Sequence, residues 1–184
     1  MRLEHNVQPI GQRELGNANM LMKSLIWILG TLAVLAVLLV IAGQLGLLKG
    51  TPPSSPGVRD GRFKPPSRTP NSVSSQAALY PDHAMREFAQ IAPLAMRGDA
   101  ATTLARLRAV VEGMPGAKMV KSEPDYLYAQ FSTRLFGFVD DAEFWFDPAA
   151  NVIQVRSASR LGRKDLGVNR ARIEAIRGLL AGAI

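Results

Sequence analysis

The sequence predicts an α+β protein: one N-terminal transmembrane helix, then a two-layer domain in which an antiparallel sheet carries helices mainly on one face. Three observations predict this arrangement. An uncharged apolar run extends from Leu25 to Gly43. A stretch dense in Pro, Gly and Ser follows it, over residues 49–72. Beyond that stretch, strand-like segments follow one another between two helical segments, and such an order favours antiparallel pairing with helices on one face.

The positive charge of the chain is concentrated outside the predicted domain. Residues 1–70 contain 8 basic and 3 acidic residues, a net +5, whereas residues 71–184 contain 14 basic and 12 acidic residues, a net +2. The chain also lacks the interleaved aromatic and basic residues that bind nucleic acid, so no nucleic-acid partner is expected. The absence of cysteine excludes disulfides, thiolate metal sites and cysteine nucleophiles.

Residues 23–48 are predicted to form a transmembrane signal anchor that contacts the lipid bilayer through residues 25–48. At about 1.5 Å per residue, this uncharged run is long enough to cross the hydrocarbon core of a membrane. A cleaved signal peptide is the alternative, but its apolar core is usually shorter than this run. Residues 1–22 then form a short N-terminal tail, for which Met20 and Met22 are alternative starts.

Residues 49–72 are predicted to be a basic linker. Their composition of Pro, Gly and Ser with a single aromatic residue, Phe63, buries too little apolar surface to offset the entropy of ordering. The prolines favour extended polyproline conformations, which predicts a semi-rigid spacer. Its basic residues can contact anionic lipid headgroups.

The globular α+β domain is expected over residues 73–184 and begins with a short strand near Ile91–Met96. Asp99 is placed to cap the first long helix, which ends at Gly113–Gly116. Asn169 is placed to cap the last helix, in which apolar residues recur at the spacing of one helix face. Four strands are predicted between these helices, at 117–123, 126–134, 139–147 and 152–160.

Alternation of apolar and polar residues assigns a register to these strands. The connecting loops are predicted at Leu135–Phe138 and Pro148–Asn151. This register places Phe131 beside Ala142, and Ala142 beside Ser157. It also aligns three polar residues at one end of the core-facing side: Thr133, Asp140 and Ser159.

The opposite face of the predicted sheet carries mixed polar and aromatic residues. One row contains Tyr128, Trp145 and Gln154. In the next row Glu143 lies opposite Arg156, and this cross-strand ion pair is expected to contribute about a few tenths of a kcal/mol.

The carboxylates Asp140, Asp141 and Glu143 resemble a metal or acid–base cluster. Adjacent strand residues point to opposite faces, so Asp140 and Asp141 cannot share a site without a bulge, and no metal site is expected. A Ser-His-Asp triad is disfavoured because both histidines lie outside this region. A catalytic alternative remains, in which Asp140 activates Ser157 or Ser159. A buried Asp–Ser hydrogen bond that closes the core is favoured over it.

A basic cluster spans Arg156 to Arg177, with seven basic and two acidic residues. Glycines flank a loop that leads into the last helix, where backbone amides and the helix dipole favour an anion. The alternative is structural: Asp165 pairs with Arg160 or Arg170 and locks the loop. This second interpretation is favoured. The candidate anion-binding residues are Arg156, Arg160, Arg163, Asp165, Asn169 and Arg170.

Three segments carry a resemblance to a known family: GFVDD at residues 137–141, VRSASR at 155–160 and GRKDLGVNR at 162–170. Together they are similar to the pattern of the uncharacterised bacterial and plastid family called domain of unknown function 1499. The resemblance covers about residues 70–180. It implies an envelope protein, a lipoprotein or membrane-anchored, with no established activity.

The resemblance also implies an oxidising compartment. Many relatives carry two cysteines six residues apart, and Pro66 and Ser72 occupy those places here. Loss of both together implies that the pair forms a disulfide in the relatives. The positive charges after the helix place the C-terminal side in the cytoplasm when counted alone, but this rule fails for long translocated regions. The compartment therefore favours a periplasmic domain.

Two functional hypotheses follow. The favoured one is a single-pass protein of the bacterial inner membrane whose non-enzymatic domain binds a partner protein or an anionic lipid headgroup near the membrane. The alternative is a hydrolase-like enzyme that uses Asp140 with Ser157 or Ser159. Neither hypothesis calls for a cofactor.

Overall fold

The computed structural model describes residues 10–182. The chain divides into two compact units at Ala42 and Gly43. The helix α1 (Ile10–Gln44) supplies the described part of the first unit, and its last two residues belong to the second. Its segment Gly16–Gln44 contains an 18-residue window with a mean hydropathy of 2.9, none of which is buried. This segment is long and apolar enough to cross a membrane, and the same properties fit a signal sequence.

The helix ends four residues before the predicted boundary at residue 48. Its last residue is Gln44, and Gly46 has a φ of 79°. Positive φ of this kind is typical of the residue that follows a helix, where glycine is favoured because it lacks a side chain. The apolar composition of residues 45–48 therefore extends beyond the helical backbone.

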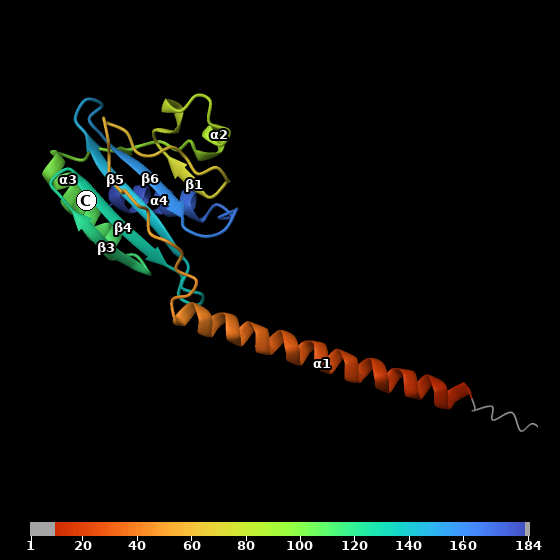
Figure 1. Cartoon of the computed structure of the whole chain (residues 1–184). Coiled ribbons are helices and arrows are strands. Elements are labelled where there is room, and N and C mark those ends of the chain that lie inside the picture. Colours follow the sequence, from red (N-terminus) through yellow and green to blue (C-terminus); the bar gives the residue numbers. More distant parts are fainter. Residues whose placement is uncertain (1–9, 183–184) are drawn as a thin grey trace, which may run out of the picture. The chain divides into compact units, whose positions relative to one another are not determined.

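The second unit contains a sheet of six antiparallel strands. Five of them are hydrogen-bonded in the order β1-β6-β5-β4-β3, and β2 pairs with the other end of β6 (Figure 1). The four long strands agree with the prediction to within two residues. The strands are β1 (Ser72–Ser74), β2 (Leu94–Ala95), β3 (Ala117–Ser122), β4 (Tyr126–Ser132), β5 (Val139–Asp147) and β6 (Val152–Ser159).

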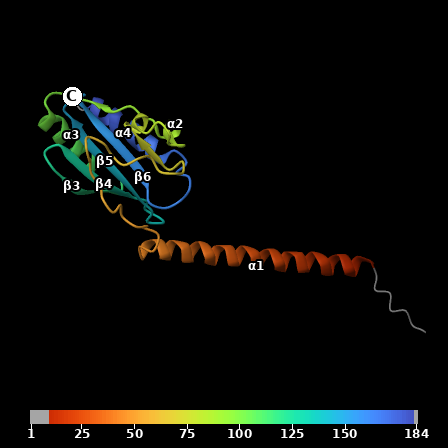
Figure 2. The same cartoon turned by 45° about the horizontal axis from the view of Figure 1, so that its top comes forward.

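Two long helices cover one face of this sheet (Figure 2). They are α3 (Ala100–Glu112) and α4 (Val168–Gly182). Asp99 caps α3 as predicted, since its carboxylate accepts a hydrogen bond from the Thr102 amide at 2.7 Å. The short helices η1 (Ala77–Leu79) and α2 (Arg86–Ala89) follow β1. The predicted α+β class, with an antiparallel sheet and helices, is confirmed.

The core lies between the sheet and the two long helices. Most of the residues predicted to face the core from the strands are buried there and meet apolar residues of both helices, but Thr133 is exposed and Ser159 is only half-buried. The buried core includes Leu104, Leu107, Val111, Leu127, Ala129, Phe131, Ala142, Phe144, Ile153, Val155, Ile173, Ile176 and Leu180.

The predicted register is correct between β5 and β6 and wrong by two residues between β4 and β5. Ala142 pairs with Ser157 as expected, but Phe131 pairs with Asp140 instead of Ala142. Thr133 is the cause: its amide bonds to the Phe138 carbonyl, and its hydroxyl accepts from the Phe138 amide. Thr133 therefore closes the turn, and the loop begins one residue earlier than the spacing predicts. A shift of two residues preserves which side chains face the core.

The predicted spacer contains a segment that packs on the sheet. Residues 57–65, here called the cover segment, lie on the face opposite α3 and α4, which we call the outer face (Figures 1 and 2). Phe63 is only 1% exposed and packs against Tyr126 and Tyr128. The expectation that residues 49–72 form a semi-rigid spacer, too poor in apolar residues to pack, is therefore wrong for the cover segment.

Backbone hydrogen bonds explain why a segment poor in apolar residues is ordered. The side-chain amide of Gln76 donates to the Gly61 carbonyl and its oxygen accepts from the Phe63 amide, both at 2.8 Å. The Tyr80 hydroxyl donates to the Phe63 carbonyl. The burial of one aromatic ring and these hydrogen bonds stabilise the segment, although it contains few apolar side chains. The compact unit accordingly includes this segment and extends from Gly43.

Candidate functional site

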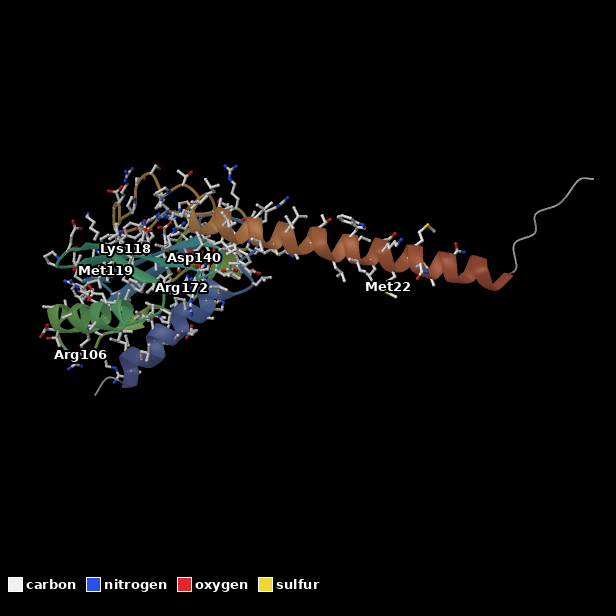
Figure 3. All side chains as sticks on the ribbon, turned by 90° about the horizontal axis from the view of Figure 1, so that it is seen from below. Met22, Arg106, Lys118, Met119, Asp140 and Arg172 are labelled. Atoms are coloured by element: carbon white, nitrogen blue, oxygen red, sulfur yellow. The ribbon has the colours of Figure 1, made fainter. Side chains whose placement is uncertain are left out.

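The predicted catalytic residues lie together at the polar end of the helix-covered face. Arg172 of α4 joins them: one of its guanidinium nitrogens donates to Asp140 and another to the Ser157 hydroxyl at 3.0 Å. Figure 3 shows Asp140 on β5 facing Arg172. The Arg172 guanidinium also stacks on the Phe131 ring, 4.6 Å from its centroid. In the sequence Arg172 belongs to the basic cluster, but it is not one of the predicted site residues.

Asn169 is the second hub of this buried network. Its side-chain oxygen accepts hydrogen bonds from Ser157 and Arg172, both at 2.6 Å. Its side-chain nitrogen donates to Ser159 at 2.9 Å and to the Asn71 carbonyl at 3.2 Å. Because Asn169 is 0% exposed, these bonds satisfy an amide that would otherwise be buried without partners.

This geometry gives the hydrolase hypothesis no support. The Ser157 hydroxyl donates to Asn169, an amide that cannot accept a proton as a base, and Ser157 is 0% exposed. In the described contacts Arg172, not a serine, is the partner of Asp140. Ser159 serves as an acceptor for Asn169. The predicted direct hydrogen bond between Asp140 and a serine is absent from the described contacts, and Arg172 links the two side chains instead.

The loop before α4 is locked by Asp165, but not through the predicted partners. Its carboxylate accepts hydrogen bonds from the backbone amides of Gly167 at 3.0 Å and Asn169 at 3.2 Å. Leu166 and Gly167 both have positive φ, which turns these amides back toward the carboxylate. The expected pairing of Asp165 with Arg160 or Arg170 is wrong. The expected cap at Asn169 is also wrong, because α4 already begins at Val168. The Asp165 carboxylate accepts the hydrogen bonds of the backbone amides at the start of the helix instead.

A second polar network lies on the outer face. Asp141 accepts two parallel hydrogen bonds from Arg160, each at 2.8 Å, and a third from the Tyr128 hydroxyl at 2.5 Å. This hydrogen bonding to Asp141 raises the pKa of the Arg160 guanidinium. Asp140 and Asp141 thus lie on opposite faces of a regular strand, as the alternation predicts. The guanidinium of Arg160 already donates two parallel hydrogen bonds to Asp141, so it has no free pair of N–H groups for a ligand.

The carboxylate of Glu143 is also on the outer face and has its own set of hydrogen bonds. One of its carboxylate oxygens accepts hydrogen bonds from the Tyr126 hydroxyl and the Gly57 amide, both at 2.6 Å. Burial, and then the negative charge of Glu143, raise the pKa of Tyr126. The other oxygen lies 3.6 Å from Arg156. Glu143 is 1% exposed, so the predicted cross-strand pair exists but is a buried one.

Arg156 is buried without the hydrogen bonds that such a side chain normally makes. It is 9% exposed, and its Nε atom has no partner in the described structure. The distance of 3.6 Å to Glu143 is too long for a hydrogen bond. Burial lowers the pKa of Arg156, and the charge of Glu143 only opposes this effect. A guanidinium has five N–H donors, and buried donors are nearly always satisfied.

A basic cavity of about 400 Å³ lies at the cover segment. Its two exposed arginines belong to one tight turn, in which Arg59 and Arg62 exchange two backbone hydrogen bonds of 2.9 Å. Asp60 and Gly61 between them both have positive φ, as a two-residue hairpin turn requires. The cavity is lined by Ser55, Gly57, Arg59, Asp60, Arg62, Phe63, Lys64, Pro65 and Tyr80.

The structure does not unite the six predicted anion-binding residues. Arg156 and Arg160 lie on the outer face, and Asp165 and Asn169 lie on the helix-covered side. The other two members are accounted for separately: the Arg170 guanidinium donates to the Phe88 carbonyl, and Arg163 is exposed.

The basic residues of the cover segment are missing from the predicted site. One signal in the sequence could have found them: the Asp-Gly dipeptide between two arginines is typical of a type I′ hairpin turn. Among the described residues, no group of three His, Cys, Asp or Glu side chains is close enough to hold a metal ion.

Comparison with known proteins identifies a family. No curated protein and no solved structure gives a significant match to this chain. One family model matches residues 62–180, which is more than half of the chain. The match begins inside the cover segment and continues almost to the end of α4. The chain belongs to the family described as protein of unknown function, DUF1499.

Proposed function

We propose that this protein is a single-pass membrane protein of the bacterial cell envelope whose periplasmic domain binds an anionic lipid headgroup and does not catalyse a reaction. The observation that carries this proposal is the basic cavity of the cover segment. Arg59, Arg62 and Lys64 line it, with Asp60 as the one acidic residue in the lining. The apolar helix α1 supports the membrane anchor. The cysteine pair of the relatives, which implies an oxidising compartment, supports the periplasmic side.

The position of these basic residues in the chain favours a membrane surface as the partner. Only a short stretch separates the end of α1 at Gln44 from Arg59. A short tether raises the effective concentration of the bilayer surface for the domain. Basic residues near an anionic surface each contribute about 1 kcal/mol of attraction. Weak individual contacts therefore suffice for a tethered domain.

Charge-neutral variants of the turn test this proposal. The full chain is placed in phosphatidylcholine nanodiscs and mixed with phosphatidylglycerol vesicles, and co-sedimentation is measured. We expect the wild type to sediment with the anionic vesicles, and the double variant Arg59→Gln/Arg62→Gln to bind roughly tenfold or more weakly, because two attractions of about 1 kcal/mol are lost.

The matched control removes the same charge elsewhere. Arg106 on α3 and Lys118 on β3 are exposed and lie outside the cavity lining (Figure 3). Arg106→Gln/Lys118→Gln should retain at least half of the wild-type binding. Equal sedimentation with phosphatidylcholine vesicles, or equal loss in both double variants, would contradict the proposal. Capture of a protein in place of lipid would favour the partner-protein hypothesis.

A further inference from the structure

We infer that one end of the second unit is a membrane-contact surface, at which exposed leucines and a phenylalanine enter the interface of the bilayer that α1 spans. This surface, here called the tip, consists of residues 45–49, 134–138 and 161–168. The inference goes beyond the proposed function. It takes from that proposal only that α1 crosses a membrane, and it does not involve the cavity of the cover segment.

The first step is that the last residues of α1 lie on the loop between β4 and β5. Gly43 and Gln44 belong to the second unit. The side-chain amide of Gln44 donates hydrogen bonds to the carbonyls of Arg134 and Leu135, at 3.0 and 3.1 Å. Gly43 is buried, and a side chain at this position would clash with the backbone of Phe136. The end of the helix and this loop are therefore held together.

The loop that follows β6 lies beside the same stretch of chain. The Arg160 amide donates to the Val139 carbonyl at 3.1 Å, so the two loops leave the sheet next to each other. Gly50 packs closely on the second loop, because a Cβ added to it would lie 2.9 Å from Cγ of Leu161. The chain from Gln44 to Gly50 therefore runs from one loop to the other and joins the three segments of the tip.

The second step is that exposed apolar side chains gather in the tip. Among the described residues of the second unit, eleven large hydrophobic side chains are exposed, of which seven lie in the tip and four elsewhere. A gathering of this kind marks an interaction surface, since soluble faces expose such side chains singly. The seven are Leu45, Leu47, Leu135, Phe138, Leu161, Leu166 and Val168, and the other four are Leu79, Phe88, Val120 and Leu179.

Leu166 is the most exposed of these side chains, at 92%. Its φ is 52°, a left-handed conformation that leucine rarely adopts and that glycine or asparagine usually supplies. The Asp165 carboxylate fixes this turn by accepting hydrogen bonds from the Gly167 and Asn169 amides. The loop therefore holds an apolar side chain outward in a strained conformation, and strain of this kind indicates a functional role for the residue.

The third step is that a bilayer lies at this end of the unit. The uncharged part of α1 runs from Leu25 to Gln44. At about 1.5 Å per residue it is about 30 Å long, which matches the hydrocarbon core of a membrane. When α1 spans the membrane, Gln44 lies at the membrane surface, and the loop to which it is hydrogen-bonded lies there too.

The charge of the tip fits an anionic lipid surface. The tip contains four basic residues and one acidic residue, a net charge of +3. All four basic side chains are exposed, and they can reach the headgroups while the apolar side chains enter the boundary below them. These five residues are Lys49, Arg134, Arg163, Lys164 and Asp165.

The test exploits the absence of cysteine from the chain. Leu135→Cys and Leu166→Cys in the tip, and Leu179→Cys as the control, are each labelled with a small environment-sensitive fluorophore. Leu135 and Leu179 are both 53% exposed, so the pair is matched in exposure. The full chain is placed in phosphatidylcholine–phosphatidylglycerol nanodiscs with or without quencher-bearing lipids. We expect lipid quenching at least about threefold stronger at positions 135 and 166 than at position 179.

A second variant tests the leucines themselves. Leu47→Gln/Leu166→Asn removes two highly exposed apolar side chains, and asparagine tolerates positive φ better than leucine. The urea midpoint of unfolding should therefore be unchanged or raised, whereas lipid quenching of the label at position 135 should fall at least about twofold. Val120→Gln/Leu179→Gln, the control outside the tip, should leave this quenching unchanged. Equal quenching in the two double variants overturns the inference.

Further outcomes separate this inference from the proposed function. Release of the protein from membranes by alkaline carbonate overturns both, because α1 is then no anchor. Retention in the membrane with quenching at positions 135 and 166 no stronger than at position 179 overturns the tip alone. Blue-shifted emission at position 166 without lipid quenching also overturns it, since a protein then covers the surface. Strong quenching in the tip without binding of phosphatidylglycerol vesicles supports the tip and overturns the headgroup proposal.

Discussion

Replacing Phe63 by alanine should lower the free energy of unfolding by about 3–5 kcal/mol, the usual cost of removing a buried phenylalanine ring. The ring is 1% exposed and packs against Tyr126, Tyr128 and Trp145 on the outer face. Urea unfolding of the full chain in detergent measures the loss. Trp145 fluorescence reports on the site directly once Trp27 of α1 is replaced by phenylalanine.

Phe88 provides the matched control for this experiment. It is 41% exposed, so Phe88→Ala should change the free energy of unfolding by no more than about 0.5 kcal/mol. If Phe63→Ala were equally mild, the cover segment would be the free spacer that its composition predicts. The cavity would then have no fixed wall, and the proposed headgroup site would lose its basis.

Removing Arg172 should have an effect of similar size. The side chains of Arg172 and Asp140 are 9% and 11% exposed, and Arg172 also donates to Ser157 and Asn169. Arg172→Met leaves the Asp140 carboxylate buried without its partner, which costs about 3–5 kcal/mol for a broken buried ion pair. Chemical denaturation measures the difference from the wild type.

A double variant separates the broken pair from simple loss of packing. Asp140→Leu/Arg172→Met removes both charges, and it should recover a large part of the stability lost in Arg172→Met, because apolar replacements of a buried pair are often neutral. The exposed pair of Arg108 and Glu112 serves as the control. Arg108→Gln should cost no more than about 0.5 kcal/mol. An additive double variant would contradict the assignment of this pair.

The sequence predicts the four long strands of the sheet well because their information is local, whereas the short strand β1 is not predicted. Alternation along β4, β5 and β6 marks the core face, and the same residues are buried against α3 and α4. The register between β5 and β6 follows from a short turn and is confirmed by the pairing of Ala142 with Ser157. The register of β4 depends on whether Thr133 ends the strand or closes the turn. Only the contacts of its hydroxyl and amide decide that question.

The site is predicted less well because its information is not local. Arg156 is recognised as basic and as the partner of Glu143, yet the sequence does not predict that its side chain is buried on the outer face. Arg172 carries no pattern that separates it from the other basic residues of α4. The polar composition of residues 57–65 predicts a spacer. The segment is ordered nevertheless, because one aromatic ring, that of Phe63, is buried against the sheet.

Crosslinking in intact membranes tests the central claim most directly. A photoreactive amino acid is introduced at Pro65, an exposed residue that lines the cavity without contributing charge, and at Lys118 as the control. After irradiation, the crosslinked products are identified by mass spectrometry. We expect a phosphate-bearing lipid crosslinked at position 65 and little or none at position 118. Crosslinks at position 65 to proteins alone, or equal lipid crosslinking at both positions, would contradict it.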